Sequence, residues 1–224
     1  MTPTPITNNS NTLLNGGIHI RQPTHGYRFS MDTVILAQNV GPKRGDKILD
    51  IGTGCGVIPI LIAHRHSGVQ ITGIELQKEL FDIARKNVAE NKMADTIRIL
   101  NMDARHITPA DTDGPFDMVV SNPPYTAVGS GRINPCLQQA LARHEIELNL
   151  KELIATAKLM LKPSGKFIVI YPEYRLNELI EEMRMAGFEP GTIKMVHTKP
   201  GQAAKRVLVS AIAGTGHARS VPDT

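Results

Sequence analysis

Between residues 46 and 186 the sequence alternates short apolar runs with segments of helical periodicity. The apolar runs are rich in Ile, Val and Leu, and the segments between them carry apolar residues on one helical face. This order predicts a mostly parallel α/β sheet with helices on both faces. Ligands bind such sheets beyond the C-terminal ends of the strands. The predicted parallel strands are residues 47–51, 69–75, 96–100, 116–121 and 166–171, and the predicted helices between them are 57–64, 77–91, 150–161 and 175–186.

Two further apolar runs, residues 192–197 and 205–211, have no helix between them. We therefore expect them to pair as a C-terminal antiparallel hairpin, which completes a seven-stranded sheet and leaves one antiparallel strand at or near an edge. Upstream of the regular pattern, residues 17–22 read as an exposed strand, and residues 33–40 read as a helix capped by Ser30 or Asp32. The expected organisation is a disordered leader 1–12, an N-terminal strand and helix 13–45, a main domain 46–212 and a flexible tail 213–224.

A glycine-rich turn follows the first strand of the main domain, in the sequence Asp50-Ile51-Gly52-Thr53-Gly54-Cys55-Gly56. Its last glycine comes one position earlier than in the dinucleotide fingerprint, which disfavours an NAD-dependent dehydrogenase. Glu75 ends the next strand about 20 residues later, where a carboxylate can bind both hydroxyls of a ribose. Because the chain has no Gly-Lys-Ser/Thr phosphate loop, these residues predict a nucleoside ligand without a phosphate cradle.

The next two strands also end in polar groups. Asp103-Ala104 follows the third strand, and Asn122-Pro123-Pro124-Tyr125 follows the fourth. Each carboxylate taken singly could be a helix N-cap or a solvated loop residue, and a Pro-rich stretch could be an ordinary turn. The prolines also make a stiff loop, in which an amide, outward carbonyls and an aromatic ring can hold a planar group that bears an NH₂. A polar group thus follows each of the first four strands at one edge of the sheet: Asp50 with the glycine-rich turn, Glu75, Asp103 and Asn122. Their shared position favours one ligand site.

This ordered set resembles the class I S-adenosylmethionine-dependent methyltransferases, which have a Rossmann-like fold. Together with Asn15-Gly16-Gly17, residues 27–37 and Ala142-Arg143-His144-Glu145, it resembles more narrowly the family of bacterial tRNA1(Val) adenine-N6 methyltransferases. The resemblance implies S-adenosylmethionine as cofactor, S-adenosylhomocysteine as product, and no metal. The cofactor-binding residues that it implies are Asp50, Gly52, Gly54, Gly56, Glu75, Leu76, Asp103, Ala104 and Asn122.

The expected catalytic residues are Asn122, Pro123 and Tyr125. An aryl or amide NH₂ is a poor nucleophile because its lone pair is delocalised. The side-chain oxygen of Asn122 and the carbonyl of Pro123 can accept its two N–H bonds and direct the lone pair at the methyl group, while Tyr125 stacks on the ring. Catalysis is then mainly orientation and electrostatics, without a strong base.

The implied substrate is an adenine in RNA, with a tRNA anticodon loop as the leading candidate. Ribosomal RNA and a protein glutamine amide are alternatives within the same class of enzyme. A catalytically silent nucleic-acid-binding paralogue is an alternative of another class. The residues that we expect to contact RNA could instead be scattered solubilising charge, and the loop 126–147 is a candidate lid. These expected RNA contacts are Arg28, Arg132, Lys199, Lys205 and Arg206.

The composition is compatible with these expectations. The formal net charge is +4, which suits a polyanionic partner without requiring one. We expect no membrane segment because no apolar run approaches the roughly 20 residues that a spanning helix needs. The N-terminus does not read as a signal peptide, and the two cysteines do not suggest a disulfide scaffold, so we expect a cytoplasmic protein. The sequence leaves open whether the protein is a monomer or a homodimer.

Overall fold

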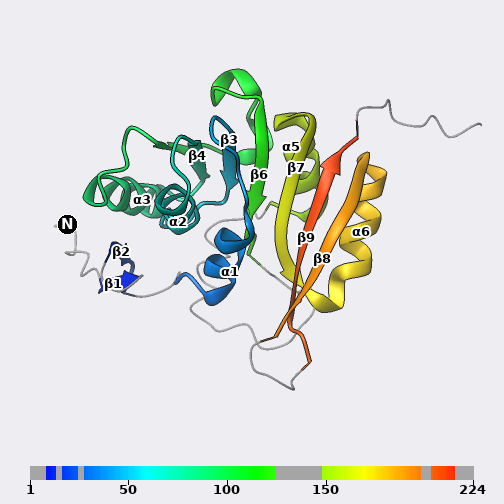
Figure 1. Cartoon of the computed structure of the whole chain (residues 1–224), viewed down its shortest axis with the longest axis horizontal. Helices are drawn as coiled ribbons and strands as arrows, with labels where there is room; N and C mark the ends of the chain where they lie inside the picture. Colours follow the sequence, from blue (N-terminus) through cyan, green and yellow to red (C-terminus); the bar gives the residue numbers. More distant parts are fainter. Residues whose placement is uncertain (1–8, 14–16, 25–27, 125–147, 198–202, 215–224) are drawn as a thin grey trace, which may run out of the picture.

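The computed structural model describes residues 9–13, 17–24, 28–124, 148–197 and 203–214. Most of these residues belong to one α/β unit built around a seven-stranded sheet with the strand order β5-β4-β3-β6-β7-β9-β8 (Figure 1). Strands β3 to β7 pair in parallel, and β9 lies antiparallel between β7 and β8. The predicted fold class is confirmed. The strands are β3 (Lys47–Ile51), β4 (Gln70–Glu75), β5 (Ile97–Asn101), β6 (Phe116–Ser121), β7 (Leu161–Pro172), β8 (Phe188–Val196) and β9 (Arg206–Ala213).

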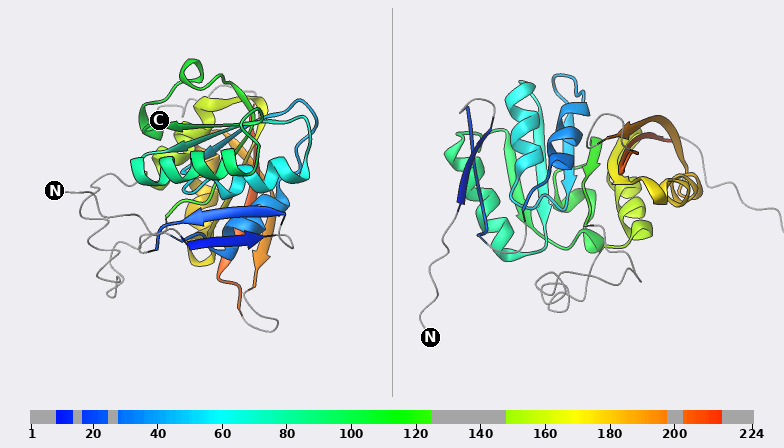
Figure 2. Two further views of the ribbon diagram at one scale, coloured as in Figure 1. Left: turned by 90° about the vertical axis from the view of Figure 1, so that its left-hand side faces the viewer. Right: turned by 90° about the horizontal axis from the view of Figure 1, so that it is seen from below.

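Helices cover both faces of the sheet, and each face has its own core. One core lies between the sheet and α1, α2 and α3, and the other lies between the sheet and α5 and α6. The view from below separates the two layers (Figure 2, right). Helix α2 is buried over most of its length, whereas α3 and α6 are amphipathic and bury one face each. The helices are α1 (Met31–Asn39), α2 (Val57–Arg65), α3 (Lys78–Glu90), α5 (Leu150–Met160) and α6 (Leu176–Met185).

Local sequence signals account for where two of these helices begin. The hydroxyl of Ser30 accepts a hydrogen bond from the backbone N–H of Asp32 and caps α1, as predicted. At α5, Asn149 and Glu152 form a capping box, in which each side chain accepts from the other residue's backbone N–H at 3.0 and 2.9 Å. The box satisfies two backbone donors that the helix itself leaves unpaired.

The N-terminal segment differs from the expectation. Residues 9–12, which the sequence assigns to a disordered leader, belong to a strand, β1 (Asn9–Leu13), that pairs antiparallel with β2 (Ile18–Gln22). The polar composition of residues 9–12 suggested disorder, but strand pairing satisfies their backbone groups without requiring apolar side chains. This two-stranded hairpin lies beside α3, separate from the main sheet (Figure 2, left).

Two other predicted boundaries also shift. Strand β7 begins at Leu161, so Pro163, Ser164 and Gly165 lie inside the strand rather than in a connection before it. Strand β9 ends at Ala213, one residue beyond the predicted end of the domain. The candidate lid 126–147 lies outside the described residues. Among those described, no helix combines the length and the apolar character needed to cross a membrane.

Candidate active site

The glycine-rich turn lies between β3 and α2, and backbone contacts hold it against neighbouring elements. The backbone N–H groups of Gly52 and Thr53 both donate to the carbonyl of Ile74 in β4, each at 2.9 Å. Gly56 has a φ of 78°, and a Cβ at this position would lie 3.2 Å from the Cβ of Ala84 in α3. Glycine therefore allows both the left-handed backbone and the close approach of the turn to α3.

Glu75 lies at the C-terminal end of β4 and is 6% exposed. One carboxylate oxygen accepts from the backbone N–H of Gly54 and the other from that of Gln77, each at 2.8 Å. Burial raises the pKa of Glu75, while these backbone hydrogen bonds act in the opposite direction. The carboxylate thus anchors the glycine-rich turn, and these contacts do not use all of its acceptor sites, so it can also accept from a ligand hydroxyl.

Asp50 is fully buried in β3, directly before the glycine-rich turn. Neither of its carboxylate oxygens, nor the hydroxyl of Thr53, has a hydrogen-bond partner among the described residues. Burial raises the pKa of Asp50 to about 7; the nearby Thr53 side chain acts in the opposite direction, and the charge of Glu75 adds to the rise. Buried polar groups are normally paired, so these orphaned oxygens mark a place where a ligand can supply donors.

Asp103, predicted to bind the cofactor, is engaged within its own segment. Its side chain accepts from the backbone N–H of Arg105 at 3.0 Å, caps the short helical turn Ala104–His106, and pairs with the Arg105 guanidinium. This hydrogen bonding lowers the pKa of Asp103. These contacts are those of a helix N-cap, the role that a carboxylate at this position could have without binding a ligand. Ala104 is partly buried, and its carbonyl accepts from the hydroxyl of Thr156 in α5 at 3.1 Å.

Asn122 leaves the sheet beside the glycine-rich turn. Ile51 of β3 and Ser121 of β6 are register partners, and the Ser121 hydroxyl donates to the Ile51 carbonyl at 2.9 Å. Gly52 and Asn122 therefore follow adjacent strands at the same level. The strand order reverses between β3 and β6, which is the switch point where α/β sheets bind ligands.

A side-chain contact orients the amide of Asn122. Its Nδ2 donates to the hydroxyl of Thr33 in α1 at 3.0 Å, and Thr33 is 3% exposed. Pro123 is buried and Pro124 is exposed, while Tyr125 lies outside the described residues. No local sequence pattern points to Thr33, because it lies 89 positions from Asn122 in the chain.

Comparisons with known proteins identify the family. A family model described as "Methyltransferase small domain" matches residues 27–186. The chain belongs to this family. It is an S-adenosylmethionine-dependent methyltransferase.

Two similar relatives carry the same name, "tRNA1(Val) (adenine(37)-N6)-methyltransferase". The one from Tolumonas auensis is 30% identical, over 85% of this chain and 78% of its own length. The one from Phocaeicola vulgatus is 32% identical, over 80% of this chain and 74% of its own length. The sequence-based assignment to this family is confirmed.

Solved structures agree with this fold. A predicted O-methyltransferase from Agrobacterium tumefaciens has a TM-score of 0.62 and 26% identity, covering 83% of this chain and 82% of its own. A methyltransferase from Pyrococcus furiosus also has a TM-score of 0.62, with 23% identity, covering 88% of this chain and 90% of its own. The second likeness concerns the fold alone.

The methyltransferase has a donor and acceptor set at this edge that fits its cofactor. S-adenosylmethionine carries ribose hydroxyls and an ammonium group, and these donors suit the buried carboxylates of Asp50 and Glu75. The exposed side chain of Leu76, 41% accessible, adds apolar surface beside Glu75. Among the described residues, no group of His, Cys, Asp and Glu could hold a metal ion.

Helix α1 is tied to the methyltransferase sheet by an ion pair that sequence analysis did not find. Arg206, the first residue of β9, donates its Nε–H to the Asp32 carboxylate at 3.0 Å and another N–H to the carbonyl of Lys205 at 3.0 Å. The guanidinium predicted to contact RNA phosphate therefore makes contacts within the fold. Together with the Asn122–Thr33 contact, this pair fixes the first turn of α1 near the end of the sheet where Gly52, Glu75 and Asn122 lie. We call this end the catalytic edge because it carries the predicted catalytic residue Asn122.

A second set of contacts that sequence analysis missed links α3 to β2. The Asn87 amide accepts from the backbone N–H of Arg21 at 2.8 Å and donates to its carbonyl at 2.9 Å. The Asn91 amide, one helical turn later, pairs with the backbone of His19 in the same way, at 3.0 and 2.7 Å. Asn87 also donates to the carbonyl of Cys55 at 2.8 Å, which joins the N-terminal hairpin to the glycine-rich turn.

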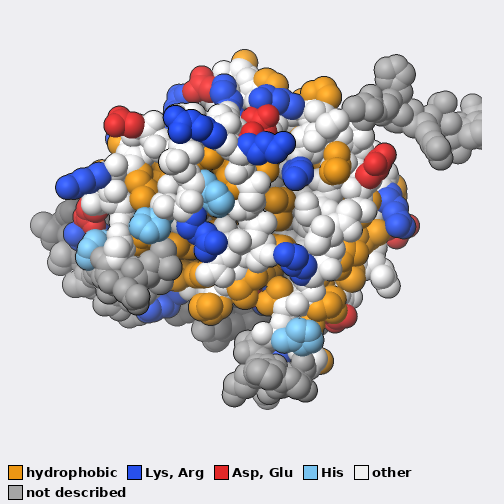
Figure 3. Space-filling view, viewed as in Figure 1, with side chains coloured by type: hydrophobic (Ala, Val, Ile, Leu, Met, Phe, Trp, Pro, Cys, Tyr) orange, Lys and Arg blue, Asp and Glu red, His pale blue; other side chains and the backbone are white. Residues whose placement is uncertain are grey.

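Of the other four residues predicted to contact RNA, the structure describes two. Arg28, just before α1, and Lys205, just before β9, are both exposed. Arg132 and Lys199 lie outside the described residues. The space-filling view shows Lys and Arg side chains spread over this face of the molecule rather than gathered in one patch (Figure 3).

Proposed function

We propose that this methyltransferase transfers a methyl group from S-adenosylmethionine to N6 of an adenine in tRNA, next to the anticodon. The observation that carries the proposal is the placement of Asn122, which leaves β6 beside the glycine-rich turn with its amide held by Thr33 at 3.0 Å. The relatives named tRNA1(Val) (adenine(37)-N6)-methyltransferase support the choice of substrate. Because tRNA is modified in the cytoplasm, the proposal places the protein there.

The proposed cofactor contacts are those at the ends of β3, β4 and β5. When bound, S-adenosylmethionine supplies an electrophilic methyl group on a sulfonium. Glu75 would hold the ribose hydroxyls, and Asp50 would accept from the cofactor's donors. The backbone at Gly52, Gly54 and Gly56 would approach the cofactor closely. Asp103 and Ala104 would lie near the base of the cofactor. Asp103 would accept an N–H from that base while it stays paired with Arg105.

The proposed catalytic step depends on orientation. The Asn122 Oδ1 and the Pro123 carbonyl would accept the two N–H bonds of the adenine amine and direct its lone pair at the methyl group. Tyr125 would stack on the base, a contact worth about 1–3 kcal/mol in other proteins. An adenine inside an RNA stack must first be splayed out, which favours a loop as the target. The N–C bond would form as the S–C bond of the sulfonium breaks, leaving S-adenosylhomocysteine. The methylated amine would then be acidic and would release its proton to water.

The test is methylation of an unmodified tRNA(Val) transcript, followed by mass spectrometry of its nucleosides. We expect N6-methyladenine with the wild-type protein. The variant Asn122→Ala should lose at least about 100-fold in rate while binding S-adenosylhomocysteine as the wild type does. Methylation of ribosomal RNA alone, or of a glutamine-bearing protein alone, would show that the substrate is wrong. Absence of methyl transfer to any of these would favour a silent RNA-binding protein.

A further inference from the structure

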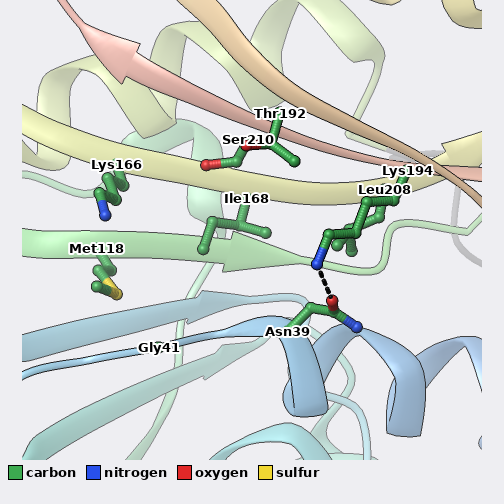
Figure 4. A pocket seen from close by; sticks show the side chains of 9 residues that line it. All are labelled: Asn39, Gly41, Met118, Lys166, Ile168, Thr192, Lys194, Leu208 and Ser210. Carbon is green, nitrogen blue, oxygen red and sulfur yellow. Dashed lines mark hydrogen bonds between the residues drawn. The ribbon is translucent and has the colours of Figure 1, made fainter.

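A groove crosses the face of the sheet that carries α1, away from the catalytic edge. Its volume is about 240 Å³, and Figure 4 shows its lining side chains on strands β6, β7, β8 and β9 and at the end of α1. We call it the sheet groove. It is lined by Asn39, Gly41, Met118, Lys166, Ile168, Thr192, Lys194, Leu208 and Ser210.

The groove exists because the helices leave this part of the sheet uncovered. Helix α1 is nine residues long and ends at Asn39, before it reaches the outer strands. Along β9, Val207, Val209 and Ala211 are buried in the core with α5 and α6. Ile212, on the opposite face, is 42% exposed. In Figure 1 no helix lies over β7, β9 and β8 on the side that faces the viewer.

The lining chemistry suits an extended anion. Lys166 and Lys194 stand at opposite ends of the sheet groove, the hydroxyls of Thr192 and Ser210 lie between them, and no carboxylate is among the lining residues (Figure 4). The Nζ of Lys194 donates to Oδ1 of Asn39 at 2.8 Å, which holds its ammonium over the groove. An ammonium has three donors, so this contact leaves Lys194 able to bind an anion.

The register of the strands gives the length of the groove. Lys166 pairs with Ile212 of β9, and Lys194 pairs with Leu208, four residues earlier on the same strand. Two strand spacings separate β7 from β8, so the two lysine Cα atoms lie roughly 16 Å apart. One strand of a nucleic acid rises about 3.4 Å per nucleotide, so roughly five nucleotides span this distance.

The direction of the groove relates it to the catalytic edge. Leu208 also pairs with Ile170, close to the C-terminal end of β7, so Lys194 marks the end nearer the catalytic edge. Lys166 pairs with Met118 of β6, which lies four residues before Asn122. Lys166 therefore lies roughly 13 Å from that edge, measured along the strands. An RNA whose target base reaches Asn122 could therefore continue along the groove from Lys194 to Lys166.

We propose that the sheet groove binds the sugar–phosphate backbone of the tRNA substrate outside the anticodon loop, with Lys194 and Lys166 facing phosphates roughly five nucleotides apart. This proposal rests on the proposed function, since it takes tRNA as the substrate. It adds a binding surface that the catalytic edge does not contain. The groove would let the protein distinguish a whole tRNA from a five-nucleotide RNA centred on the target adenine, because only the longer molecule reaches Lys166.

The test compares the binding of two RNAs by fluorescence anisotropy at several salt concentrations: a tRNA(Val) transcript and a five-nucleotide RNA centred on the target adenine. The variant Lys166→Glu should weaken binding of the tRNA about tenfold and lower the slope of log K against log salt by about one. Its binding of the five-nucleotide RNA and of S-adenosylhomocysteine should match the wild type. Lys151→Glu is the control for net charge, because it makes the same charge change on α5, which covers the opposite face of the sheet. It also removes the ion pair of Lys151 with Glu182, so thermal unfolding must show that this variant is folded.

Two outcomes would overturn the proposal. One is wild-type tRNA affinity in Lys166→Glu, and the other is an equal loss in Lys166→Glu and Lys151→Glu, which would show an effect of net charge alone. A further variant, Glu189→Gln, removes a carboxylate from the same face, where Glu189 pairs with Ile212, and should strengthen tRNA binding. Failure of the proposed function is separate, since it would appear as absent methylation of both RNAs by the wild type.

Discussion

The residue with the least satisfied environment is Asp50, a carboxyl buried without a hydrogen-bond partner among the described residues. Its pKa is raised to about 7 by burial. Structure alone gives no reason to keep such a group, because an unpaired buried polar group costs stability. The cost is understandable if the cofactor supplies the missing donors, as a strained or unsatisfied site often serves function.

This environment predicts a pH dependence of stability. A carboxyl whose pKa is higher in the folded than in the unfolded protein favours folding at low pH, and this contribution is lost as pH rises from about 4 to about 7. The loss is on the order of 4 kcal/mol for Asp50. Asp50→Asn cannot ionise, so in the cofactor-free protein its free energy of unfolding at pH 8 should exceed that of the wild type.

Urea unfolding at a series of pH values measures this difference. A smaller slope of the same sign should remain in Asp50→Asn, because burial also raises the pKa of Glu75. If both proteins lose the same stability between pH 4 and pH 7, Asp50 is not the titrating group. Addition of S-adenosylmethionine should stabilise the wild type more than the variant.

At the scale of elements, the contact between α3 and β2 works like a strand pairing. Asn87 and Asn91 lie one helical turn apart and bind alternate residues of β2, Arg21 and His19, through both backbone groups. The two amides satisfy backbone groups at one edge of the N-terminal hairpin, and Arg21 adds an ion pair with Glu90. Only Asn87 reaches on to the glycine-rich turn, at the carbonyl of Cys55.

This difference predicts separable effects of two substitutions in α3. Asn87→Ala should weaken S-adenosylhomocysteine binding about tenfold, because losing one buried hydrogen bond loosens the turn. Asn91→Ala should leave the affinity unchanged, since it contacts β2 but not the turn. Both variants should speed hydrogen exchange at the backbone amides of β2. Calorimetry provides the affinities, and equal affinities for the two variants would contradict a role of Asn87 in positioning the turn.

At the scale of the whole molecule, basic residues divide into those that hold the fold together and those that remain exposed. Arg206 is paired with Asp32, with 30% and 19% side-chain exposure, and joins β9 to α1. Lys205, its neighbour in sequence, is exposed and contributes to the fold through its backbone. Some of the basic residues counted in the net charge of +4 are therefore engaged within the fold and are less available to an RNA partner.

The two neighbours should respond differently to substitution. Lys205→Glu should weaken tRNA binding and lower its salt dependence with little change in melting temperature, because Lys205 is a predicted phosphate contact on the surface. Arg206→Gln should instead lower the unfolding free energy by up to about 1 kcal/mol, because a partly exposed ion pair contributes little more. Anisotropy and thermal unfolding measure the two effects. An unchanged salt slope in Lys205→Glu would exclude it as a phosphate contact.

Much of the fold and part of the candidate site follow from local patterns. The alternation of apolar runs and helical segments predicts the seven-stranded sheet, and parallel strands bring their C-terminal ends to one edge. Gly52, Glu75 and Asn122 could therefore be placed together before any contact was known. The strand β1 could not, because its polar residues carry no period that distinguishes a paired strand from a disordered segment.

By itself, the sequence determined the sheet, its catalytic edge and the residues that follow each strand, since these depend on periods of two and 3.6 that local segments carry. The tertiary structure alone decided what those residues contact. Thr33 meets Asn122 across 89 positions, and Asp32 meets Arg206 across 174. The sheet groove likewise depends on where α1 ends relative to β8. Such pairings follow from how distant elements pack, and no local pattern encodes them.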